Sequence, residues 1–235
     1  MRKIGLGVFL CLVFAPISNG ATISLWNFNE ATTDTNGESL QLPADFGNGI
    51  MTSSFIPSNI SYYSGTDLNS QMGDAAGQAL NLRGYANNGE NLTWMVDTTG
   101  FSLIDVSFAT RGTSTGFNSN QFMYSIDSGI SWTNFGSPYS PSSSFALQNF
   151  DLSGIFDLDH NPGTGFRILF DGATSSTGNN RIDNLVVSGI PSMPPDTTPV
   201  PEPSTMTLIA LGLAGIFYAR GKAGSQRHRQ RRILS

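Results

Sequence analysis

The residue types between positions 21 and 190 allow few kinds of catalysis. This region has a single histidine, His160, and no serine in it is surrounded by the glycine pattern of a nucleophile elbow. The one cysteine of the chain, Cys11, precedes the region, which therefore has no thiol for a disulfide, a zinc site or a nucleophile. We expect no catalytic residues, although fifteen acidic side chains leave a pair of glycosidase carboxylates as an alternative.

Oxygen-bearing side chains in one short segment favour a calcium ion. Asp157, Asp159 and Asn161 alternate with other residues, a spacing that places three oxygen donors on one side of a loop. The segment is not an EF-hand, because Pro162 stands where that motif needs glycine and Ile168 stands where it needs glutamate. A solvated acidic turn before a strand is the alternative to a structural calcium ion.

Three residues are candidates for binding a sugar. Trp132 follows an expected turn and Tyr139 lies in a loop rich in serine and proline, so we expect both aromatic rings to be exposed. Arg111 is the third candidate, because cations are scarce between positions 21 and 190. The four are Arg83, Arg111, Arg167 and Arg181. An ion pair with a neighbouring acid is the alternative role for Arg111.

The charge balance of this region excludes one class of partner. Fifteen acidic and four basic side chains give it a net charge of −11, whereas the whole chain has a net charge of −5. Such a surface repels the phosphates of nucleic acids, so we expect no binding to nucleic acid. The charge suits cation binding or an acidic extracellular setting, and simple solubility is the alternative explanation.

Hydrophobic residues between positions 21 and 190 recur with period two, which predicts β-strands. The alternating runs are 92–96, 104–108, 122–126, 166–170 and 182–187, with turn pairs such as Asn88-Gly89 and Asp171-Gly172 between them. Trp94 alternates with apolar neighbours and is expected in the core. Residues 124–132 predict a hairpin in which Gly129 adopts positive φ in a three-residue loop. We predict an all-β fold, an antiparallel sandwich of jelly-roll type with about eight to ten strands.

The N-terminus has the features of an export signal. Residues 1–20 begin with Arg2 and Lys3, continue with an apolar stretch, and end in small residues suited to cleavage between Gly20 and Ala21. An uncleaved anchor helix is the alternative. Residues 21–190 are then one domain, and the crowded prolines of residues 191–203 predict a stiff extended linker.

The C-terminus has three parts in a fixed order. A Pro201-Glu202-Pro203 triplet precedes an apolar segment, residues 204–219, which predicts a single transmembrane helix. The tail of residues 220–235 carries basic side chains and no acid, as expected on the cytoplasmic side of a membrane; these are Arg220, Lys222, Arg227, Arg229, Arg231 and Arg232. A soluble helix with a tail that binds nucleic acid is the alternative.

This C-terminal order resembles the PEP-CTERM sorting signal of exported proteins in Gram-negative bacteria that make extracellular polysaccharide. The resemblance implies that exosortase, a membrane-embedded cysteine protease-transpeptidase, recognises the chain and cleaves it near Pro201-Glu202-Pro203. It further implies an inner-membrane-tethered precursor, which is then released to the cell surface or the extracellular matrix.

Two weaker resemblances concern residues 21–190. Arg181-Ile-Asp-Asn-Leu185 is similar to the closing strand of jelly-roll carbohydrate-binding modules, and Trp26–Glu30 resembles their opening strand, which implies Glu30 and Asp183 as calcium ligands. Residues 106–111 and 170–184 resemble a β-rich module of exported bacterial surface proteins. The function expected from all these features is a non-catalytic surface module that binds polysaccharide. A structural or adhesive protein without a glycan ligand and a polysaccharide hydrolase are the alternatives.

Overall fold

The computed structural model describes residues 20–30 and 39–192. Contacts divide the chain into the units Met1–Ser192 and Met193–Ser235, and all the described residues belong to the first unit. The predicted signal peptide up to residue 19, the Pro-Glu-Pro triplet, the apolar segment and the basic tail lie outside the described residues. No helix in the described part of the chain is both long enough and apolar enough to cross a membrane.

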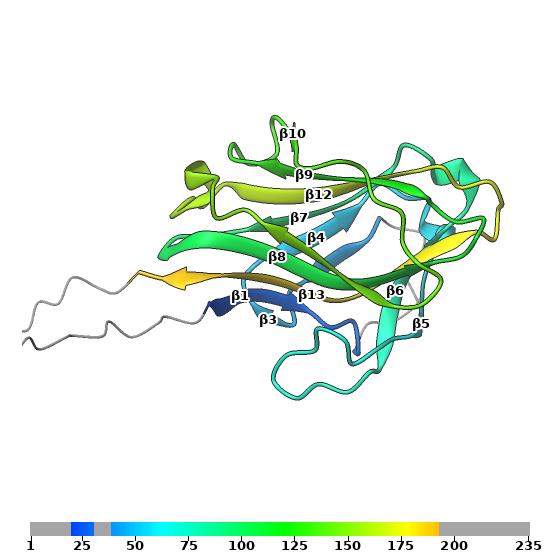
Figure 1. Cartoon of the computed structure of the whole chain (residues 1–235), viewed down its shortest axis with the longest axis horizontal. Helices are drawn as coiled ribbons and strands as arrows, with labels where there is room; N and C mark the ends of the chain where they lie inside the picture. The colour runs from blue at the N-terminus through cyan, green and yellow to red at the C-terminus, as the bar shows by residue number, and fades with distance from the viewer. Residues whose placement is uncertain (1–19, 31–38, 193–235) are drawn as a thin grey trace, which may run out of the picture. The chain divides into compact units, whose positions relative to one another are not determined.

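In the residues that the structure describes, the fold consists of two antiparallel sheets with the strands given below (Figure 1), which confirms the predicted all-β class. Sheet A contains seven strands: β1 (Ala21–Trp26), β3 (Phe46–Gly47), β5 (Ile60–Ser64), β6 (Gln78–Arg83), β8 (Phe101–Gly112), β11 (Ala146–Asp151) and β13 (Asn179–Pro191). Sheet B contains six strands: β2 (Gln41–Pro43), β4 (Ile50–Ser53), β7 (Asn91–Val96), β9 (Ser119–Ser125), β10 (Thr133–Asn134) and β12 (Thr164–Asp171). Within the described residues the helices are three short 3₁₀ turns, η1 (Pro57–Asn59), η2 (Tyr85–Asn87) and η3 (Phe156–Leu158).

Strand order places the long strand β13 at the centre of sheet A. It pairs with β8 on one side, and on the other side first with β6 and then with β1. In sheet B the order is β10-β9-β12-β7-β4-β2. Since Ala21 of β1 pairs with Gly189 of β13, the domain begins and ends at the same end of the sandwich (Figure 1).

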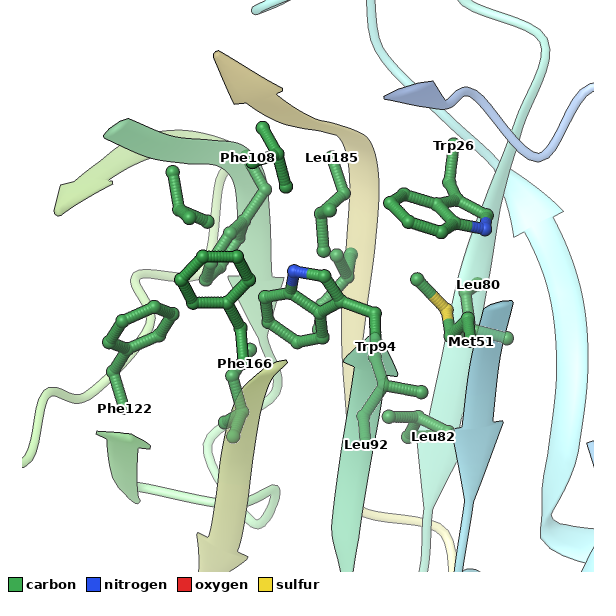
Figure 2. Close-up of a cluster of buried hydrophobic side chains, with 14 of the residues drawn as sticks. Trp26, Met51, Leu80, Leu82, Leu92, Trp94, Phe108, Phe122, Phe166 and Leu185 are labelled. Carbon is green, nitrogen blue, oxygen red and sulfur yellow. The ribbon is translucent and has the colours of Figure 1, made fainter. Parts of the chain in front are cut away.

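The core lies between the sheets and is formed by the residues that the period-two pattern assigns to one face. Figure 2 shows side chains from both sheets meeting there, with the fully buried Trp94 among them, which confirms its predicted core position. The rings of Phe122 in sheet B and Phe150 in sheet A stack with centroids 3.9 Å apart. Burying each such side chain contributes about 1.5–3 kcal/mol to stability.

The predicted hairpin between β9 and β10 is present, but its loop is longer than expected. Thr133 pairs with Tyr124, so the connection runs from residue 126 to residue 132 rather than over three residues. Gly129 has the predicted positive φ of 82°. The extra residues are held by Asp127, whose carboxylate accepts hydrogen bonds from Ser125 Oγ (2.7 Å) and from Ser131 N (2.9 Å) and Oγ (2.6 Å).

A β-bulge interrupts the pairing of β13 with β8. The register shifts between Asp183 and Val186, and Asn184 adopts a left-handed conformation with φ of 48°. The connection between β5 and β6 folds over this bulge and is bonded to it. Asn184 Nδ2 donates to the carbonyl oxygens of Thr66 (2.8 Å) and Leu68 (3.0 Å).

Candidate functional site

Trp132 lies on the outer face of sheet B, the face that points away from the core. Its indole rests at Gly165 of β12, where an added Cβ would lie 3.2 Å from the ring and 2.7 Å from Met95 Sδ. Gly165 therefore makes the room that the ring occupies. Trp132 Nε1 donates to Gly129 O at 3.1 Å, which satisfies the polar edge of the indole within its own loop.

Arg167 of β12 completes this arrangement. Its guanidinium carbon lies 3.9 Å from the centroid of the Trp132 ring, and its Nε donates to Thr93 Oγ1 at 2.9 Å. Thr93 Oγ1 in turn donates to Asn91 Oδ1 at 3.0 Å. Partial burial lowers the pKa of Arg167. This chain of contacts fixes a half-buried indole in one orientation beside a cation.

The strands around Arg167 carry further hydrogen-bonding side chains on the same face. Arg167 lies opposite Met123 of β9 and Thr93 of β7, and Thr93 lies opposite Thr52 of β4. Gln41 of β2 extends this row to the edge of the sheet. A fixed aromatic ring beside a row of polar side chains offers stacking and hydrogen bonds to one extended ligand.

The structure does not bring the three sugar-binding candidates together. Tyr139 is half-buried rather than exposed, because its ring packs 6.4 Å from Phe108 and 6.0 Å from Phe150, and burial raises its pKa. Its loop is held down by backbone hydrogen bonds in both directions with Asn120, of 2.9 and 3.0 Å. Both rings were expected to be exposed and both are half-buried, so this expectation was wrong. Trp132 keeps its place as a candidate because its ring lies on the outer face of sheet B, whereas Tyr139 packs against the core.

Arg111 lies on the opposite side of the sandwich, on the outer face of sheet A. It is paired across the strands with another arginine, Arg181, and its guanidinium carbon lies 5.9 Å from the ring centroid of Phe145. In the described residues, the contacts of Arg111 are therefore with an arginine and an aromatic ring, and not with the acid that the alternative ion pair would need.

Two of the three predicted calcium ligands, Asp159 and Asn161, use a side-chain oxygen within the protein. Asp159 Oδ1 accepts from Leu103 N at 2.9 Å, and Asn161 Oδ1 accepts from Gly163 N at 2.7 Å. Asn161 Nδ2 donates to the carbonyl oxygens of Asp157 (2.9 Å) and Ile126 (3.0 Å). Asn161 thus connects neighbouring loops. Its side-chain nitrogen donates to the backbone of this segment, and its side-chain oxygen accepts from Gly163 N.

Asp183 and Glu30 have contrasting surroundings. Asp183 is fully buried, and its carboxylate accepts from Thr66 N at 2.7 Å and Asn184 N at 2.9 Å. Burial raises its pKa to about 7, against the lowering effect of these two hydrogen bonds. Glu30 is exposed. Within residues 20–30 and 39–192 no group of three or more His, Cys, Asp and Glu side chains could hold a metal ion, so calcium stays a prediction from the sequence.

Two features of the structure, in different places, were not predicted from the sequence. Glu30 lines a polar pocket of about 280 Å³ together with Asn27, Asn29, Asp45 and Asp74, which come from three separate stretches of the chain. The other feature is the role of Arg167 as the partner of Trp132. The sequence contained a sign of this role, because Arg167 is the one charged residue in the apolar run of residues 166–170.

The C-terminal region matches a known family. Residues 199–222 match the PEP-CTERM protein-sorting motif. The chain carries a PEP-CTERM sorting signal. This match confirms the signal predicted from the Pro201-Glu202-Pro203 order, and it indicates an exported protein. No curated protein matches the chain in sequence.

Solved structures similar to the chain include carbohydrate-binding modules and a domain of an arabinanase. A family 61 module in complex with β-1,4-galactotriose is 9% identical with a TM-score of 0.36, over 59% of this chain and 86% of that one. Domain 4 of AbnA, an extracellular arabinanase of Geobacillus stearothermophilus, in complex with arabinotriose, is 13% identical with a TM-score of 0.41, over 74% and 95%.

A third similar structure is the tandem of family 22 modules of Paenibacillus barcinonensis Xyn10C. It is 9% identical with a TM-score of 0.45 over 80% of this chain, and the match spans half of that tandem. The three identities and TM-scores are too low for the ligands of these proteins to be carried over to this chain.

Proposed function

We propose that this chain is an exported protein that exosortase sorts to the cell surface or extracellular matrix, where its β-sandwich binds polysaccharide without catalysis. The sorting part rests on the PEP-CTERM motif at residues 199–222. The binding part rests on one observation, the Trp132 ring held beside Arg167 on the outer face of sheet B.

This arrangement suits a sugar for two physical reasons. The C–H face of a pyranose packs on an aromatic ring, and a ring whose orientation is already fixed loses little entropy when the ligand binds. The guanidinium of Arg167, the hydroxyl of Thr52 and the amide of Gln41 can bond to sugar hydroxyls, and the buried Thr93 in the same row holds Arg167 in place. The row crosses four strands of sheet B, so it fits several consecutive sugars rather than one.

The experiment is a glycan array probed with the detergent-solubilised full-length protein, followed by titration of each glycan that binds. Trp132→Ala should weaken binding about 10- to 100-fold, because the burial and stacking of one aromatic ring are lost. Phe156→Ala is the matched control, since Phe156 is an aromatic residue that is 74% exposed on η3. Unchanged binding by the Phe156 variant would confirm that the loss is specific to Trp132.

Two results would contradict the proposal. Absence of binding to every glycan, including the polysaccharide of the producing bacterium, would favour a structural or adhesive role. Turnover of a bound polysaccharide that a single carboxylate substitution abolishes would identify a hydrolase.

A further inference from the structure

Three of the four arginines in the domain lie on the outer face of sheet A. Arg83 of β6, Arg181 of β13 and Arg111 of β8 each alternate with core residues on their strands, and these three strands are neighbours. Arg181 pairs directly with Arg111, and Arg83 is opposite Asn179, two residues before Arg181. The strand spacing separates the outer two arginines by about 10 Å across the sheet, and their offset of two residues separates them by about 7 Å along it.

The Arg111–Arg181 pair is unfavourable by itself. Residues directly opposite in an antiparallel pair have Cβ atoms about 5 Å apart, and like charges there destabilise the sheet. Partial burial, together with the charge of Arg111, lowers the pKa of Arg181. The domain has fifteen acidic side chains that could have relieved this repulsion.

Within the described part of the chain, the hydrogen bonds of Arg181 and Arg83 leave their charge uncompensated. Arg181 Nη1 donates to Ser64 O at 3.2 Å and Arg83 Nη2 donates to Ser58 O at 3.0 Å, and both acceptors are neutral carbonyls. Arg181 Nε is buried and has no hydrogen-bond partner among the described residues. The nearest acid along the same face of β13 is Asp183, whose carboxylate is already bonded to the backbone N–H groups of Thr66 and Asn184.

Aromatic rings flank the pair on both sides. The guanidinium carbon of Arg181 lies 5.0 Å from the ring centroid of Tyr63, and that of Arg111 lies 5.9 Å from the ring centroid of Phe145. Tyr63 is 47% exposed, so it offers a surface to a ligand beside the charges. Two planar cations between two rings therefore present both charge and apolar surface at one place.

We propose that Arg111 and Arg181, with Arg83 at the edge, bind the carboxylates of a uronate-containing polysaccharide. Guanidinium groups bind carboxylates through paired, charge-assisted hydrogen bonds, and a row of three lets one polymer engage more than one of them. The flanking rings favour a sugar, whose C–H faces pack on them, over the acidic side chains of a protein. This inference rests on the proposed polysaccharide binding and names the class of ligand, but it uses the face opposite to Trp132.

The test uses the full-length protein and two polymers with the same backbone, polygalacturonate and its fully methyl-esterified, uncharged form. Polygalacturonate should bind at least tenfold more tightly. Arg111→Gln and Arg181→Gln should each weaken that binding about 10- to 100-fold and leave the esterified polymer unaffected. Ser137→Asp makes the same change in net charge at an exposed position after β10 of sheet B, and it should change the affinity less than twofold.

Several outcomes would overturn the inference. Equal affinity for the two polymers would mean that the site does not recognise carboxylates, and equal losses in the Ser137 and Arg111 variants would mean that only net charge matters. Binding of polyglutamate as tight as that of polygalacturonate would assign the arginines to acidic proteins. If Arg181→Gln does not fold, Arg111→Gln and the charge-retaining Arg111→Lys variant carry the test.

Trp132→Ala separates this inference from the proposed function. It should leave the preference for the charged polymer intact, because Trp132 lies on the other sheet. If Trp132→Ala abolishes binding of both polymers while the arginine variants bind normally, polysaccharide binding stands and the carboxylate site is wrong.

Discussion

The guanidinium carbon of Arg167 lies 3.9 Å from the centroid of the Trp132 ring, although Arg167 belongs to β12 and Trp132 to the loop between β9 and β10. The contact exists because Gly165, opposite Met95 on β7, has no side chain to occupy the space under the indole. The orientation of Trp132 therefore depends on three elements at once, the hairpin loop, β12 and β7.

Gly165→Ala should disturb this arrangement without any change to Trp132 itself. The new Cβ would lie 2.7 Å from Met95 Sδ and 3.2 Å from the indole, so both side chains must move. We expect a loss of about 1–3 kcal/mol in stability, a shift in tryptophan fluorescence and weaker glycan binding. Gly154→Ala is the control, since a Cβ there meets no atom within 4 Å. Unaltered fluorescence in the Gly165 variant would show that Trp132 is not seated as described.

Asn184→Ala should loosen the connection between β5 and β6. The variant loses the hydrogen bonds to Thr66 O and Leu68 O and places alanine at a φ of 48°. These losses predict a destabilisation of about 2–4 kcal/mol in urea unfolding and faster amide exchange at residues 66–70. Asn134→Ala, at an exposed position on β10, should stay within about 0.5 kcal/mol of wild type. Protected amides in the Asn184 variant would contradict the role given to this side chain.

Features that depend on the order of neighbouring residues in the chain could be predicted from the sequence. Alternation placed Trp94 in the core, and the order of the C-terminal residues identified the sorting motif. Features that depend on which strands become neighbours could not be predicted. The pairing of Arg111 with Arg181 requires the register of β8 with β13, and Tyr139 is half-buried because its loop bonds to Asn120, nineteen positions earlier. No local pattern encodes either partner.

The sorting motif predicts a processing event. Replacing Glu202 and Pro203 with alanine removes two of the three residues of the triplet, including the fixed backbone dihedral of one proline. In a host that has exosortase, the variant should accumulate as a precursor that retains a C-terminal epitope tag, whereas the parent chain loses it. Immunoblotting of membrane and extracellular fractions measures this, and an exosortase deletion strain supplies the control. Loss of the tag at the normal rate in the variant would contradict recognition of the triplet.

Asp183 predicts how stability depends on pH. Burial raises its pKa in the folded state to about 7, above the usual value of about 3.9 in the unfolded chain. The folded state therefore holds the proton of Asp183 more tightly than the unfolded state does. The contribution of Asp183 to the free energy of unfolding is greatest below about pH 4, falls between about pH 4 and 7, and is constant above about pH 7. The loss amounts to a few kcal/mol, about 4 at most. Asp183→Asn should remove this slope from urea unfolding curves, and an identical slope in the variant would assign the pH dependence to other groups.

The net charge of −11 between positions 21 and 190 predicts that calcium stabilises the domain. Folding brings those carboxylates together, and a bound divalent cation would relieve the repulsion. An ion that binds only the folded state, present at about 100 times its Kd, adds roughly 2.7 kcal/mol, which corresponds to a rise of about 5–10 °C in Tm. The measurement compares millimolar calcium with a chelator, and sodium of equal ionic strength controls for screening.

Single variants then locate the ion. If calcium binds at Asp183, its effect should grow as the pH rises through about 7, because the metal needs the ionised carboxylate, and Asp183→Asn should abolish it. If it binds in the loop of residues 157–161, Asp159→Ala should abolish the effect and the pH dependence should be weak. Equal Tm values in calcium and in matched sodium would mean that the acidic groups are merely solvated and that no calcium site exists.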